Sequence, residues 1–293
     1  MKAPDFSYVQ ATSVKEAVAA FRACEGDARY LAGGQSLLAA LNLRLAAPHL
    51  LIDIGRIDEL RGIARDGDEV IIGALTRHAE ILSSDIIARD VPLLSLAAPF
   101  VAHPAIRNKG TFGGSLALAD PASEFPAVAL ALGARIKITG AEGTRLVAAD
   151  DYFIDLYETA LAPGEVLTAV YCPVARPTQY FAFDELARRR GDYALIGVAI
   201  NADGGRSHIE AIRIVFFAAG PTPMRARAAE AVLIGRGLTD DAIAAAQAAL
   251  SDDIAPDDDA HMTAAARMHL ARVLLRRQLA QIRLSMSGKV GAS

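Results

Sequence analysis

The sequence is poor in cysteine and in aromatic residues: its 293 residues include two cysteines, no tryptophan and 6% aromatics. Cys24 and Cys172 are too few to supply the ligands of an iron–sulfur cluster or of a structural zinc ion. Two thiols also make a disulfide framework implausible. Any iron–sulfur chemistry connected with this chain is therefore expected in another polypeptide.

The pattern of the sequence also leads us to expect no signal peptide, no membrane-spanning helix and no basic surface stripe. Residues 1–6 contain no apolar h-region, and runs such as residues 126–134 are far shorter than the roughly 18–20 residues of a membrane-spanning helix. The formal net charge is -4, and the run of Arg188, Arg189 and Arg190 is typical of a solvated or interface edge. We therefore expect a cytoplasmic protein that neither binds nucleic acid nor spans a membrane.

What is present is the composition of a folded α+β protein with more than one unit. Hydrophobic residues make up 53% of the chain and charged residues 22%, as in ordinary globular proteins. Residues 1–57 are expected to form a small α/β unit, and residues 58–173 a second one. In residues 174–284 strands precede helices, which is typical of a separate domain. Residues 285–293 are expected to form a disordered tail.

Capping residues, apolar periodicity and turn residues place the elements along the chain. Ser13 and Glu16 fit a capping box at the start of a helix that Gly26 ends, whereas residues 103–120 have few helix-favouring features. Strands are expected at residues 29–32, 50–54, 69–74, 135–139, 145–147, 165–171, 180–188, 194–202 and 209–218. Further helices are expected at residues 36–45, 91–101, 124–132, 224–234, 240–250 and 263–283.

Two loops with a glycine pair, at residues 31–38 and 110–116, are the most informative local pattern. Each ends in a small polar residue, Ser36 or Ser115, at an expected helix start. Glycine allows backbone N–H groups to approach a ligand without interference from a Cβ, and free N–H groups at a helix start bind phosphate. Two such loops together predict a diphosphate held from both sides.

Five short motifs occur in one order along the chain. They are Ala-Gly-Gly-Gln-Ser at 32–36, Ile-Arg-Asn-Lys-Gly-Thr-Phe-Gly-Gly-Ser at 106–115, Asp-Pro-Ala-Ser-Glu at 120–124, Arg-Arg-Arg-Gly-Asp-Tyr-Ala at 188–194 and Pro-Thr-Pro-Met-Arg-Ala at 221–226. Together they resemble the FAD-binding medium subunits of molybdenum hydroxylases, such as carbon monoxide dehydrogenase and xanthine dehydrogenase. The resemblance covers about residues 4–283. It implies a PCMH-type (VAO-like) FAD-binding α/β domain of two subdomains, followed by a three-stranded antiparallel sheet with a helix bundle.

The resemblance also implies which residues bind FAD. The first loop would surround the pyrophosphate with backbone N–H groups and the Ser36 hydroxyl, and the second would contact phosphate and the ribityl chain. Leu167 would make a backbone contact to the cofactor. The expected FAD-binding residues are Leu31, Ala32, Gly33, Gly34, Gln35, Ser36, Leu37, Thr111, Phe112, Gly113, Gly114, Ser115, Glu124, Leu167 and Tyr193. No catalytic residue and no metal ligand is expected in this chain.

Two of these positions allow a second interpretation. Glu124 is expected to accept hydrogen bonds from the sugar-like chain of the flavin, or else to place a favourable charge at a helix start, with Asp120 as a structural cap. Tyr193 would lie beside the isoalloxazine ring, or else be a buried strand tyrosine. His103 is expected to be structural.

The chain departs from the family pattern at two places. Phe112 stands where Ile or Val is expected, and its bulk would alter packing near the flavin or fill the core. Asp184 and Glu185 occupy the stretch in which some relatives have a lysine near the flavin. Stabilisation of reduced flavin by a lysine is therefore not expected here.

The resemblance implies an electron-transfer subunit of an oxidoreductase. FAD in this chain would receive electrons from [2Fe-2S] clusters in a small subunit, after oxidation of the substrate at molybdopterin in a large subunit, and pass them to an external acceptor. A dimer of heterotrimers is expected. Two other functions remain open: a self-contained FAD-dependent oxidase or dehydrogenase with its own substrate pocket, and a nucleotide-binding or assembly protein that has lost flavin.

Overall fold

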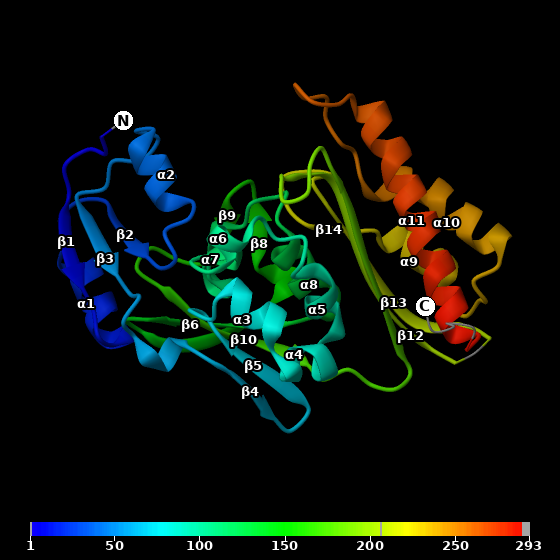
Figure 1. Ribbon diagram of the computed structural model, residues 1–293, viewed down its shortest axis with the longest axis horizontal. Coiled ribbons are helices and arrows are strands. Elements are labelled where there is room, and N and C mark those ends of the chain that lie inside the picture. Colours follow the sequence, from blue (N-terminus) through cyan, green and yellow to red (C-terminus); the bar gives the residue numbers. More distant parts are fainter. Residues whose placement is uncertain (1, 206, 289–293) are drawn as a thin grey trace.

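The computed structural model describes residues 2–205 and 207–288, and in it three main sheets follow one another along the long axis (Figure 1). A small parallel sheet lies at the N-terminal end and a five-stranded antiparallel sheet with helices lies in the middle. A four-stranded antiparallel sheet, covered on its outer face by three helices, lies at the C-terminal end. The mixed helix and strand class expected from the sequence is confirmed.

Residues 7–57, the N-terminal lobe, are built around a three-stranded parallel sheet with strand order β1-β3-β2. The apolar β3 is the central strand, as its lack of alternation predicts. The helix after Ser13 begins as predicted, because the Ser13 hydroxyl accepts a hydrogen bond from the Glu16 N–H. The elements of the lobe are β1 (Ser7–Gln10), α1 (Val14–Ala23), β2 (Ala28–Leu31), α2 (Leu37–Asn42) and β3 (Leu50–Asp53). The short and half-exposed β1 carries no apolar pattern and was not predicted.

A turn of 3-10 helix, η1 (Asp58–Leu60), leads from the lobe to the central sheet, in which β10 pairs with both β5 and β6. The hairpin predicted around residues 140–143 is present as β6 and β7. The strand order β4-β5-β10-β6-β7 comprises β4 (Ile63–Asp66), β5 (Glu69–Gly73), β10 (Val166–Pro173), β6 (Arg135–Gly140) and β7 (Gly143–Ala148). A 3-10 turn, η2 (Ala149–Asp151), and a small hairpin of β8 (Phe153–Asp155) and β9 (Glu158–Thr159) follow β7.

The helices of the central part correct two expectations. Residues 103–120 form two short helices, and the second has its glycine pair inside its first turn because the Thr111 hydroxyl caps the helix three residues before it was expected to start. The single helix expected at residues 91–101 is shorter and is preceded by another. The central helices are α3 (His78–Ser83), α4 (Asp85–Asp90), α5 (Pro92–Ala97), α6 (Pro104–Arg107), α7 (Phe112–Leu118) and α8 (Glu124–Leu132).

Helix α8 is the buried centre of the molecule. Its residues from Phe125 to Leu132 are all buried, and it contacts β10 on one side and the sheet strands β12 (Ala194–Gly204) and β13 (Ile209–Phe217) on the other. A helix that is apolar on every face is expected to be enclosed. Its last carbonyls accept hydrogen bonds from Arg213 and Asn201 of the C-terminal sheet. The helix ends at Gly133 in the left-handed conformation, as the sequence predicts.

The C-terminal sheet has four strands where three were expected. Met224 and Arg225 pair with β13 rather than starting a helix. The sheet order is β11 (Gln179–Ala187), β12, β13 and β14 (Met224–Arg225), and its helices are α9 (Arg227–Leu233), α10 (Asp240–Asp253) and α11 (Ala264–Met286). Helix α11 extends past Ser285, so the start of the expected tail is helical. Residues 289–293 of that tail lie outside the described residues.

One acidic residue links the central and C-terminal parts. Asp150 in η2 forms ion pairs with Arg213 of β13, Arg225 of β14 and Arg227 of α9. Arg225 also pairs with the buried Glu230 of α9. These contacts fix the face of the C-terminal sheet against the end of β7.

Candidate cofactor-binding site

The two glycine loops meet at the boundary between the N-terminal lobe and the central part. The α-carbon of Gly33 lies so close to the second loop that a Cβ there would be 2.3 Å from the Lys109 carbonyl oxygen. A Cβ at Gly114 would likewise come within 4.0 Å of Ala32. The prediction that both loops serve one site is therefore supported by their direct contact.

The first loop presents a row of unused hydrogen-bond donors. The backbone N–H groups of Gly33, Gly34, Gln35, Ser36 and Leu37 donate no hydrogen bond to any described residue. The Gln35 side chain closes the loop by donating to the Gly33 carbonyl at 3.1 Å, and Gly34 has φ +73°. Consecutive N–H groups on one concave turn form an anion-binding site. Because α2 has only six residues, these amides, and not a long helix dipole, are the main attraction for an anion.

The second loop differs, because its amides are already occupied. The N–H of Phe112 donates to Thr76, that of Gly113 to Ala74, and that of Gly114 to the Thr111 hydroxyl, at 2.8, 2.8 and 3.2 Å. Its glycines are instead required by close packing, since a Cβ at Gly113 would lie 2.5 Å from the Cβ of Ala74. The two loops therefore have different roles: the first offers donors, and the second forms a rigid wall.

Each loop contributes one free hydroxyl. The Ser36 side chain is exposed and the Ser115 side chain is half-buried, and neither has a hydrogen-bond partner among the residues that the structure describes. The Arg77 guanidinium holds the start of the second loop, because it donates a hydrogen bond to the Lys109 carbonyl at 2.7 Å. The buried His78 ring packs edge-on against Phe125 and beneath Gly110, which cannot carry a side chain there. The wall is thus held by side chains that the sequence patterns did not single out.

Glu124 lies at the start of α8, where the chain leaves the second loop region. Its side chain is half-buried, and burial raises the pKa of the Glu124 carboxyl to about 7, with a further contribution from the negative charge of Asp120. Asp120 is held in the preceding turn, where it accepts a hydrogen bond from the Ala122 N–H at 2.9 Å. Asp120 is therefore structural, as expected, although the N-cap position of α8 is Ser123.

Two exposed tyrosines stand near this carboxyl pair. Tyr193 is 69% exposed, so the alternative interpretation of a buried strand tyrosine is wrong. Partial desolvation and the negative charges of Asp120 and Glu124 raise its pKa. Tyr157, at the tip of the β8–β9 hairpin with φ 56°, donates to Asp120 at 3.4 Å. No local signal identifies Tyr157, because it reaches the site from 37 residues away.

Two of the predicted FAD-binding residues have side chains in the core. Phe112 is fully buried and packs edge-on against Phe125, with ring centroids 5.2 Å apart. Leu167 is buried on β10 beside the central core. Only the backbones of these two residues are available to a ligand. The ring of His103, an exposed residue, packs against Gly191, and its structural role stays a prediction.

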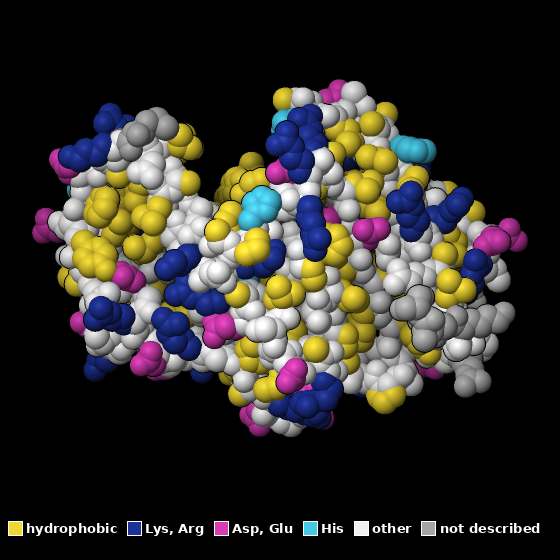
Figure 2. Space-filling model, viewed as in Figure 1, with side chains coloured by type: hydrophobic (Ala, Val, Ile, Leu, Met, Phe, Trp, Pro, Cys, Tyr) yellow, Lys and Arg dark blue, Asp and Glu magenta, His cyan; other side chains and the backbone are white. Residues whose placement is uncertain are grey.

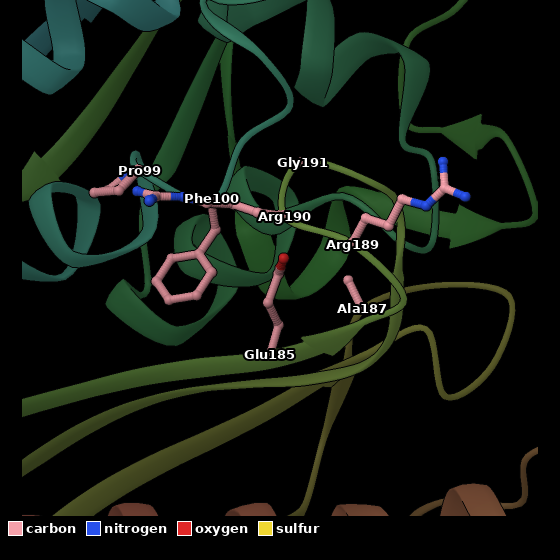
Figure 3. Close-up of a pocket in the computed structure, with 7 residues that line it drawn as sticks. All are labelled: Pro99, Phe100, Glu185, Ala187, Arg189, Arg190 and Gly191. Carbon is pink, nitrogen blue, oxygen red and sulfur yellow. The ribbon is translucent and has the colours of Figure 1, made fainter.

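A cavity of about 280 Å³ lies where the central part meets β11, beside the turn at Gly191 that leads to Tyr193. We call it the Glu185 cavity. Glu185 rises from β11 toward the turn at Gly191, with the Phe100 ring to one side, whereas the Arg189 guanidinium points away (Figure 3). The cavity is lined by Pro99, Phe100, Glu185, Ala187, Arg189, Arg190 and Gly191.

The surface agrees with a site between the lobe and the rest of the molecule. In the space-filling view the molecule is hollowed between the N-terminal lobe and the central part, and Lys and Arg side chains gather beside the lower end of this hollow (Figure 2). In the described residues no helix is long and apolar enough to cross a membrane. The same residues contain no group of three or more acidic, His or Cys side chains arranged to hold a metal ion.

A lobe with free amides, a packed glycine wall and a separate C-terminal domain define a protein that binds a phosphate-containing cofactor. Residues 4–175 match the family model for the FAD-binding domain in molybdopterin dehydrogenase, and residues 181–282 match that for the C-terminal domain of the CO dehydrogenase flavoprotein. The chain belongs to this family of FAD-binding oxidoreductase subunits. The resemblance drawn from the five motifs is therefore confirmed.

Similar proteins cover nearly the whole chain. The 6-hydroxypseudooxynicotine dehydrogenase complex subunit alpha of Paenarthrobacter nicotinovorans is 39% identical, over 96% of this chain and 95% of its own length. The carbon monoxide dehydrogenase medium chain of Hydrogenophaga pseudoflava is 38% identical, over 92% of this chain and 96% of its own length. A solved structure of carbon monoxide dehydrogenase from Hydrogenophaga pseudoflava superposes with a TM-score of 0.94 at 38% identity, covering 96% of this chain and 98% of that one.

Proposed function

We propose that this chain holds FAD between its two glycine loops and transfers electrons through it within a molybdenum hydroxylase complex. In this proposal a large molybdopterin subunit oxidises the substrate. A small subunit with [2Fe-2S] clusters delivers the electrons to FAD, and an external acceptor receives them. The complex is a cytoplasmic dimer of heterotrimers, and the two free cysteines, Cys24 and Cys172, fit a reducing compartment.

The observation that carries this proposal is the row of five unused amides in the first loop. FAD carries a pyrophosphate, and an anion of this kind is bound well by several N–H donors that need no rearrangement. The Ser36 and Ser115 hydroxyls would add one donor from each loop. Gly33 supports the fit, since its α-carbon packs against the Lys109 carbonyl and leaves no room for a side chain.

The remaining predicted contacts extend from the loops toward Tyr193. The proposed FAD-binding set consists of residues 31–37 and 111–115 together with Glu124, Leu167 and Tyr193. Glu124, partly protonated near neutral pH, would exchange hydrogen bonds with the hydroxyls of the ribityl chain. FAD supplies the redox chemistry when it is bound, and the residues of this chain bind and orient it.

A reconstitution experiment tests the proposal. The full chain, purified alone and incubated with FAD, is expected to retain an equimolar amount of flavin after gel filtration. Addition of candidate substrate alone should leave the flavin absorbance unchanged, because the substrate site lies in another subunit. Failure of the wild-type chain to retain FAD would overturn the proposal, and bleaching of the flavin by substrate without partners would favour a self-contained oxidase.

A further inference from the structure

The Glu185 carboxyl is a buried group with no partner. Glu185 is 9% exposed, and its Oε2 atom is buried without any hydrogen bond to the described residues. Arg189 and Arg190 line the same cavity, but neither forms an ion pair with Glu185. An unpaired buried carboxylate is costly, and such a group lowers that cost by keeping its proton. The carboxyl therefore keeps its proton, and its Oε2 atom has no hydrogen-bond partner among the described residues.

The position of Glu185 on β11 directs it toward the candidate site. Successive side chains of a strand point to opposite faces, and the neighbouring Asp184 accepts a hydrogen bond from Gln278 of α11 on the outer face. Phe183 shares the inner face with Glu185 and packs against Phe100, with ring centroids 5.2 Å apart. Glu185 therefore faces the central part of the molecule and the cavity.

The charges around Glu185 come from three elements. Asp184 lies on the same strand as Glu185, and Glu124 lies at the start of α8. Arg189 and Arg190 lie in the loop after β11. Burial raises the pKa of Glu185 to about 8, and the negative charges of Glu124 and Asp184 contribute to the rise. Glu124 also acts on Tyr193. Glu185 and Gly191 line the same cavity, and Glu185 points toward the turn at Gly191, two residues before Tyr193 (Figure 3). Glu185 therefore lies close to the turn that carries Tyr193.

We infer that Glu185 donates a proton to the ring of the FAD bound at this end of the site, an inference that rests on the proposed function. With FAD bound, the Glu185 O–H group would donate a hydrogen bond to a ring nitrogen. Reduction by two electrons from the partner subunit would be balanced by transfer of the Glu185 proton, so that its O–H bond breaks and an N–H bond forms on the ring. Glu185 would stay a carboxylate while the flavin is reduced, and solvent in the cavity would restore its proton when the flavin is oxidised again.

Infrared spectroscopy of the full chain loaded with FAD tests this inference. Reduced-minus-oxidised difference spectra, with dithionite as the reductant, are expected to contain a change in the C=O band of a protonated carboxyl group. The band should be lost in Glu185→Gln, which keeps the volume of the side chain, and retained in the matched control Asp184→Asn. Isotope-labelled glutamate should shift the band in the wild-type protein, so the assignment does not depend on the variant alone.

A second measurement is the midpoint potential of the bound FAD between pH 6 and pH 9. The wild type is expected to change its pH slope near the pH at which Glu185 loses its proton, and Glu185→Gln should lose this change. A carboxyl band that persists in Glu185→Gln, or an unaltered pH slope, would overturn the inference while leaving the proposed function intact. Failure of the wild type to bind FAD would instead overturn the proposed function.

Discussion

Gly33 and Lys109 are in van der Waals contact across the boundary between the N-terminal lobe and the central part. The contact joins the α-carbon of Gly33 to the carbonyl of Lys109, and a Cβ would fall 2.3 Å from that oxygen. Since the neighbour is backbone, it cannot rotate away as a side chain could. The donor row of the first loop is therefore positioned against the second loop by the absence of one methyl group.

Substitution of Gly33 tests this contact. Gly33→Ala is expected to separate the loops and weaken FAD binding about 10-fold or more, because roughly 1.4 kcal/mol of lost contact energy changes an affinity tenfold. The dissociation constant can be measured by quenching of flavin fluorescence. Gly205→Ala is the matched control, since a Cβ there meets no atom within 4 Å. Equal affinity of Gly33→Ala and wild type would contradict the proposed position of the cofactor.

Substitution of Tyr193 tests whether the flavin ring lies at the end of the site away from the glycine loops. Tyr193→Ala is expected to weaken FAD binding by roughly 2- to 10-fold, because aromatic stacking contributes about 0.5–1.5 kcal/mol. The flavin absorbance band should also shift when the ring loses its neighbour. Tyr193→Phe keeps the aromatic face and should restore both properties. If the alanine variant binds FAD like the wild type and has the same spectrum, Tyr193 does not contact the ring.

The ion pairs of Asp150 predict an effect on stability. Asp150→Asn weakens contacts to Arg213, Arg225 and Arg227, and we expect a loss of about 1 kcal/mol in the free energy of unfolding at pH 7, since the network is partly exposed. The arginines lower the pKa of Asp150, so its contribution is present above the pKa of the unfolded state and is lost as the pH falls. Urea denaturation at pH 7 and pH 3.5 checks both statements, with Asp151→Asn as the neighbouring control.

Glu185 predicts the opposite dependence on pH. Its folded pKa of about 8 lies above its ordinary value of 4.5, so the folded state binds more protons between these pH values. The contribution of Glu185 to stability is therefore full below about pH 4.5 and is lost as the pH rises to about 8. Glu185→Gln removes this loss and should be more stable than the wild type at pH 9 by roughly 1–2 kcal/mol.

Thermal denaturation from pH 5 to pH 9 measures this effect. The difference in melting temperature between Glu185→Gln and the wild type should grow as the pH rises. Glu158→Gln, at an exposed position of the β8–β9 hairpin, should follow the wild type throughout. A constant difference between Glu185→Gln and the wild type would mean that Glu185 titrates normally.

The sequence predicted well those helices and strands that are marked by their own residues, such as a capping residue, a terminal glycine or an apolar run. The range of α8 was predicted to the residue, because Gly133 ends it and Glu124 opens it. The long strands β11, β12 and β13 were also found within two residues of their ends. The two-residue strand β14 was missed, because Met224 and Arg225 pair with β13 only once the sheet has formed. The start of helix α7 was predicted three residues too late, because a glycine pair disfavours a helix and only the Thr111 cap and the packing of the pair allow one there.

The candidate site could be predicted only in part, because some of its properties depend on residues that are distant in the sequence. The glycine pairs marked both loops, but the sequence could not distinguish free amides from occupied ones. That distinction depends on Ala74 and Thr76, which are distant in sequence from Gly113 and Phe112. The unpaired carboxyl of Glu185 was likewise invisible, since its isolation results from which face of β11 meets the central part.

The small size of the N-terminal lobe has a consequence for the protein in the cell. Its core contains few large side chains and is completed by Leu60, Leu75 and Val166 from outside the lobe. Units of this size bury a small share of their surface and are only marginally stable alone. A ligand bridging the two loops at about 100 times its dissociation constant would stabilise the folded state by about 2.7 kcal/mol. We therefore expect the supply of flavin to set how much of this chain escapes degradation before it assembles with other proteins.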